Sequence, residues 1–124
     1  PNAKQMALMK KLLDESLRDG ALGLSSQVMM PPGSLATVDD VSELCQVVAK
    51  YKAIYSTHIR NEGLGVFEAV KEAIEVGRRT GVPVDIIHLK IADRAAESDE
   101  TFPDVKVCGI RSSRRSEAGR AIPH

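Results

Sequence analysis

Two of the three histidines in this 124-residue chain end apolar segments that lie one structural repeat apart. His58 comes near the end of the segment 53–59, and His88 ends the segment 82–88, 30 residues later. In a fold of parallel βα units, this spacing predicts that both imidazoles lie at the carboxyl ends of neighbouring strands, where such folds gather functional groups. Two neutral imidazoles there can share a zinc ion. The alternative is that each histidine only makes a hydrogen bond at its strand end.

A basic residue follows each histidine at the same distance. Arg60 stands two residues after His58, and Lys90 stands two residues after His88. A guanidinium fork or an ammonium at this rim can hold a substrate carboxylate. Two simpler interpretations stay open, in which Arg60 pairs with Glu62 and Lys90 is a solvated charge.

Three helical segments alternate with three extended ones and must position these residues. Apolar residues at helical spacing, such as Met6, Met9, Leu13 and Leu17 with Leu8 and Leu12 beside them, indicate amphipathic helices. The expected helices are 2–19, 37–50 and 66–80, and the expected strands are 21–26, 53–59 and 82–88.

The order α-β-α-β-α-β predicts an α/β fold with parallel strands, because single-helix crossovers join parallel neighbours. Parallel sheets are normally buried on both faces, and Ile86 next to Ile87 fits that pattern. Either a doubly wound sheet or part of a (βα)8 barrel satisfies this order.

Composition excludes several classes of function. Seventeen basic and seventeen acidic side chains give a net charge of zero, which argues against binding to nucleic acid or to a membrane surface. No apolar run is long enough to span a bilayer. Cys45 and Cys108 form no CxxC pair, which fits a reducing compartment, and we expect a cytoplasmic protein. Cys45 lies on an apolar helix stripe and is interpreted as a buried, inert thiol.

The character of the sequence changes after about residue 93. Residues 1–90 contain ten leucines, whereas residues 91–124 contain none. We therefore expect a folded part over 1–93 and a poorly ordered tail over 94–124, which is either a divergent extension or the product of a shifted reading frame or foreign join.

Four motifs in order carry a family resemblance. They are residues 20–26 (GALGLSS), 31–33 (PPG), 56–63 (STHIRNEG) and 81–90 (GVPVDIIHLK). Over residues 1 to about 93 the chain resembles the central part of the N-acyl-D-amino-acid deacylases (D-aminoacylases) of the amidohydrolase superfamily.

The resemblance implies a partial (βα)8 barrel of the metal-dependent hydrolase type, with the strands here as its fourth, fifth and sixth. His58 and His88 would match metal ligands, with one or two zinc ions in the parent enzyme. Lys90 would contact the substrate carboxylate. In the family, zinc activates a water that attacks the amide carbonyl of an N-acyl amino acid, and an aspartate of the eighth strand moves the proton. That aspartate is expected downstream, so no catalytic residue is assigned here.

Two other functions stay open. The first is a non-catalytic α/β module that binds a partner, and the second is an amidohydrolase that acts on a cyclic amide. Three strands cannot close a barrel, so the chain alone is expected to be inactive and to self-associate through its open sheet edges.

Overall fold

The computed structural model describes residues 1–89. The sequence-based interpretations of Lys90, of Cys108, of the boundary near residue 93 and of the tail 94–124 lie outside this part of the chain.

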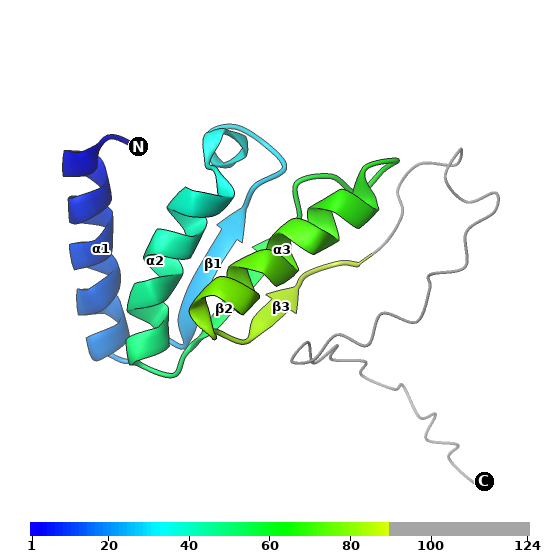
Figure 1. Ribbon diagram of the computed structural model, residues 1–124. Coiled ribbons are helices and arrows are strands. Elements are labelled where there is room, and N and C mark those ends of the chain that lie inside the picture. The colour runs from blue at the N-terminus through cyan, green and yellow to red at the C-terminus, as the bar shows by residue number, and fades with distance from the viewer. Residues whose placement is uncertain (90–124) are drawn as a thin grey trace, which may run out of the picture.

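Three helices and three strands alternate along residues 1–89, as the sequence predicts. The order is α1 (Ala3–Arg18), β1 (Gly23–Gln27), the 3-10 helix η1 (Gly33–Leu35), α2 (Val38–Lys50), β2 (Ile54–His58), α3 (Val66–Thr80) and β3 (Val84–Ile86). The strands form one parallel sheet in the order β1-β2-β3. The helices lie side by side on one face of that sheet (Figure 1). The expected α/β fold with parallel strands is confirmed.

Local sequence explains where the helices begin and end. Asn2 and Gln5 form a reciprocal capping box before α1, and Thr37 and Asp40 form another before α2. Gly81 ends α3 with a left-handed φ of 72°, a conformation that costs glycine little. Because such signals are local, the expected helix bounds are correct to within one or two residues at each end.

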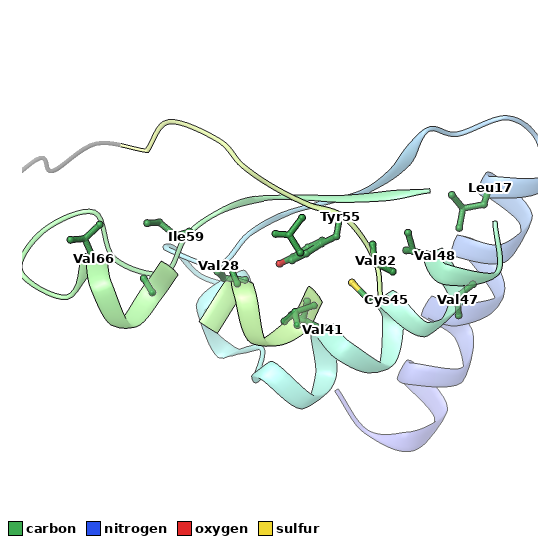
Figure 2. Packing of buried hydrophobic residues seen from close by; sticks show 14 residues of the cluster. Leu17, Val28, Val41, Cys45, Val47, Val48, Tyr55, Ile59, Val66 and Val82 are labelled. Atoms are coloured by element: carbon green, nitrogen blue, oxygen red, sulfur yellow. The ribbon is translucent and has the colours of Figure 1, made fainter. Parts of the chain in front are cut away.

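The buried core lies between the sheet and the helices. Tyr55, Thr57 and Ile59 project from β2 and the residue after it into this layer and are at most 2% exposed. Cys45 and Val48 of α2 meet them from the helix side and are fully buried (Figure 2). The sequence-based expectation that Cys45 is a buried thiol is confirmed, and its burial raises the pKa of the thiol to about 12.

The opposite face of the sheet differs from the sequence-based expectation. Ser25 and Gln27 of β1 are exposed there, and Ile54 of β2 keeps 42% of its surface exposed. Within residues 1–89, the helices lie on the other face, where α2 and α3 contact the strands, so the sheet is buried on one face and not on both (Figure 1). We call this uncovered surface the open face.

The apolar stripe expected on α1 is also only partly covered. Met6 and Leu17 are buried, whereas Leu8, Met9 and Leu12 are 56%, 42% and 53% exposed. In the described residues α1 packs on α2 alone among the helices, so its outer apolar side chains have no neighbour to bury them. No helix within residues 1–89 is long and apolar enough to cross a membrane.

Candidate functional site

His58 projects from the open face at the carboxyl end of β2. Side chains alternate along a strand, and Tyr55 and Thr57 point into the helical layer. Ser56 and His58 must therefore point the other way. Register places His58 beside Gln27 of β1, at the same rim.

His88 reaches that rim by a different route from the one that the sequence suggests. Partners across β2 and β3 are 29 positions apart, as in Thr57 beside Ile86. His58 is therefore level with Ile87, and an extended chain would turn His88 toward the helical layer, like Ile86 two residues before it. Instead β3 ends at Ile86, and His88 adopts a left-handed φ of 55°. This turn, which is uncommon for a residue with a Cβ, brings His88 to His58.

The two imidazoles lie together at the rim. Their ring centroids are 5.2 Å apart and the ring planes are tilted by 42°. Two imidazole ligands of one tetrahedral ion have ring centres about 5 Å apart, since each nitrogen lies about 2.0–2.1 Å from the metal. The pair therefore fits a shared ion. Within residues 1–89 no group of three or more potential ligands gathers around it, so further ligands would have to come from elsewhere.

A buried chain of hydroxyl groups holds the His58 backbone from the helical side. Thr57 Oγ1 donates to the His58 carbonyl at 3.1 Å, and the amide of Val28 donates to the same oxygen at 3.2 Å. Thr57 Oγ1 lies 2.9 Å from Ser26 Oγ, which lies 2.7 Å from the Tyr55 hydroxyl. Each hydroxyl has one proton, so the order runs from Tyr55 through Ser26 and Thr57 to His58. Burial raises the pKa of Tyr55, which keeps the phenol protonated as the donor.

A second polar pair lies on the open face below the histidines. Ser56 Oγ donates to Asp85 Oδ2 at 2.8 Å, between residues that are direct partners in the sheet. Neither this pair nor the hydroxyl chain was foreseen from the sequence. The signal available was the alternation of polar and apolar side chains along 53–59, which separates the two faces once the register is known.

The loop between β1 and α2 lies against the same rim. A Cβ at Gly33 would come within 1.9 Å of the Gln27 carbonyl oxygen, so only glycine permits this approach. The motif Pro31-Pro32-Gly33 thus returns the chain to the end of β1, where η1 begins.

Arg60 is bound within the protein. Its Nε donates to both carboxylate oxygens of Glu72, at 2.8 and 3.1 Å, and Nη2 donates to one of them at 2.6 Å. Nη1 and Nη2 also donate to the carbonyls of Ser34 and Ala36, each at 2.8 Å. The structure thus pairs Arg60 with Glu72, whereas the sequence left open a substrate anion or Glu62 as its partner. A substrate anion would have to displace at least one of these oxygens.

Comparison with known proteins identifies similar chains. No protein-family model matches the sequence. The chain is 33% identical over 110 residues to the D-aminoacylase of Alcaligenes xylosoxydans xylosoxydans, an alignment that covers 87% of this chain and 23% of that protein. At 110 residues, the alignment is longer than the 93 residues to which we expected the resemblance to extend.

Two solved structures have the same arrangement of elements. A crystal structure of a D-aminoacylase, described as defining a novel subset of amidohydrolases, matches with a TM-score of 0.75 and 32% identity, over 77% of this chain and 20% of that one. An N-acyl-D-glutamate deacylase from Bordetella bronchiseptica, complexed with zinc and a phosphonate inhibitor, matches with a TM-score of 0.67 and 34% identity, over 68% and 18%. The chain therefore spans about a fifth of the length of these relatives.

Proposed function

We propose that this chain, which belongs to the N-acyl-D-amino-acid deacylase family, supplies part of the active site of a zinc-dependent enzyme that hydrolyses the amide bond of N-acyl-D-amino acids. The observation that carries the proposal is the approach of His58 and His88 to a centroid separation of 5.2 Å on the open face. Relatives named as D-aminoacylase and as N-acyl-D-glutamate and N-acyl-D-aspartate deacylases support the substrate class. These relatives favour hydrolysis of N-acyl-D-amino acids over hydrolysis of a cyclic amide, and an enzyme over a non-catalytic module.

The two histidines would hold zinc as neutral imidazoles, each through one ring nitrogen. One of the solved relatives was crystallised with zinc, and another is described as having a binuclear metal centre. A bound zinc ion supplies Lewis acidity and lowers the pKa of water. The left-handed turn at His88 and the hydrogen bonds to the His58 carbonyl would set the direction of the two rings before the ion arrives.

We assign to Lys90 the role of binding the substrate carboxylate. It follows His88 by two residues in the sequence, and its ammonium group would orient an N-acyl amino acid by its charge. Among residues 1–89 none is assigned the proton transfer, and the one carboxylate shown on the open face, Asp85, accepts a hydrogen bond from Ser56.

Zinc binding and amide hydrolysis test the proposal together. Isothermal titration of the 124-residue chain should show one zinc site, which is lost in His58→Ala and in His88→Ala. The same chain should release no D-glutamate from N-acetyl-D-glutamate, because none of residues 1–89 is assigned the proton transfer that the reaction needs. Zinc affinity that stays at the wild-type level in both variants would overturn the metal site. Hydrolysis that disappears in His88→Ala would show that the catalytic group lies within this chain.

We propose as well that the isolated chain self-associates through its sheet edges. Among the described residues, β1 and β3 each pair with β2 alone, which leaves one side of each without a partner strand. Unpaired strand edges are templates for further strands. Sedimentation velocity should show a mass that rises with concentration, and a monomer across the concentration range would contradict this proposal.

A further inference from the structure

Arg60 lies where three parts of the molecule meet. It follows β2 by two residues, its carboxylate partner Glu72 belongs to α3, and its two carbonyl partners belong to the β1–α2 loop. All three guanidinium nitrogens donate to protein oxygens within 3.1 Å. One side chain thus connects the end of β2, helix α3 and the loop between β1 and α2.

The contact differs from the other arginine ion pairs of the described residues. The side chains of Arg60 and Glu72 are 30% and 21% exposed. By contrast, the side chains of Arg78 and Arg79, which pair with Glu75 on the surface of α3, are 71% and 40% exposed. A half-buried guanidinium with two carbonyl acceptors and one carboxylate uses its planar fork, a geometry that a lysine ammonium cannot reproduce.

We propose that Arg60 is a positioning residue that fixes the β1–α2 loop at the rim beside the histidine pair. The loop carbonyls of Ser34 and Ala36 are held in place by the guanidinium, and Glu72 holds the guanidinium. Because Arg60 is two residues from His58, the same contacts hold the chain that leaves the metal ligand. The inference rests on the proposed function for the role of the rim, but the loop contact stands on its own geometry.

Hydrogen exchange of the loop tests the contact directly. Arg60→Lys keeps the charge and removes the fork, while Arg79→Lys makes the same change at an exposed pair on α3. Exchange of the amides of residues 33–37 should quicken by about ten-fold or more in Arg60→Lys, since charge-assisted hydrogen bonds are lost, and should stay unchanged in Arg79→Lys. Glu72→Gln should reproduce the effect of Arg60→Lys. Unchanged loop exchange in Arg60→Lys would overturn the proposal.

Zinc affinity separates positioning from support of the fold. Loss of a residue that hydrogen-bonds directly to a metal ligand weakens metal binding by about 10- to 100-fold, and Arg60 acts one step further away, through the backbone. We expect Arg60→Lys to weaken zinc binding by about ten-fold while circular dichroism shows the helices intact. Wild-type zinc affinity together with fast loop exchange would overturn the positioning role. A wild-type chain that binds no zinc would overturn the proposed function instead, and loop exchange would then decide the role of Arg60 alone.

Discussion

The two faces of the sheet are built from the same three strands and differ in almost every physical respect. The helical face buries Tyr55, Ile59 and the side chains of α2 and α3, and its hydroxyl groups hydrogen-bond to one another. The open face carries Ser56, Asp85 and both histidines, and no helix of the described residues covers it. Stability is thus concentrated on one face and candidate chemistry on the other. We therefore expect substitutions on the helical face to cost more stability than substitutions on the open face.

The largest expected effect is a loss of packing on the helical face. Ile59 is 1% exposed, so Ile59→Ala should lower the free energy of unfolding by about 3 kcal/mol through lost burial and a cavity. Ile54 lies on the open side of β2 and is 42% exposed, so Ile54→Ala should cost less than about 1 kcal/mol. Urea denaturation measures both. Equal losses would show that the two faces do not differ in this way.

Replacing His88 should affect stability less than Ile59→Ala. His88→Gly removes an imidazole but permits the left-handed φ of 55° without strain, so the free energy of unfolding should change by at most about 1 kcal/mol. His88→Ala keeps the strained conformation and should be no more stable than His88→Gly. The same urea titrations decide this order. A clearly more stable alanine variant would mean that the turn is not imposed on the chain.

Ser42 is the one orphan polar group found among the buried side chains of residues 1–89. Its hydroxyl is buried without a hydrogen-bond partner. Ser42→Ala should therefore leave the fold unchanged or raise the free energy of unfolding by up to about 1 kcal/mol. Ser16 is a matched control on α1, because its exposed hydroxyl donates to the Leu12 carbonyl. A loss above about 1 kcal/mol in Ser42→Ala would indicate a partner for the hydroxyl.

The smallest effect concerns acid stability at the surface of α3. Hydrogen bonds from Arg78 and Arg79 lower the pKa of Glu75 to about 2. A carboxyl with a lowered folded pKa stabilises the protein above its unfolded pKa of about 4.5, and that contribution is lost as pH falls toward 2. Glu75→Gln should flatten the pH dependence of stability in this interval, and added salt should do the same. An unchanged acid profile in Glu75→Gln would show that the pairs do not form in solution.

Much of the fold could be predicted because its signals are local. Capping residues such as Asn2 and Thr37, and apolar residues at helical spacing, lie within a few positions of the elements that they determine. The uncovered apolar residues of α1 could not be predicted in this way. Periodicity shows that Leu8 and Leu12 lie on an apolar side of a helix, but not whether any neighbour covers that side.

The approach of the two histidines could be predicted from the sequence, but the way in which the chain achieves it could not. A spacing of 30 residues correctly brought His58 and His88 to one rim, yet the register between β2 and β3 is 29. In an extended chain this difference of one residue would turn His88 toward the helical layer. The left-handed conformation of His88 turns it to the open face instead. The partner of Arg60 could not be predicted from neighbouring residues either. Glu72 is 12 positions away in the sequence and reaches Arg60 because α3 packs against the end of β2.

If the open face brings His58 and His88 together to hold one metal ion, both rings must respond to the same ion. A zinc titration of the 124-residue chain, followed through the NMR resonances of its histidine rings, measures this. We expect the signals of His58 and His88 to change together and to reach their limit at one equivalent of zinc, while those of His124 do not follow them. Separate midpoints for the two rings, or saturation of His124 in place of either, would contradict it.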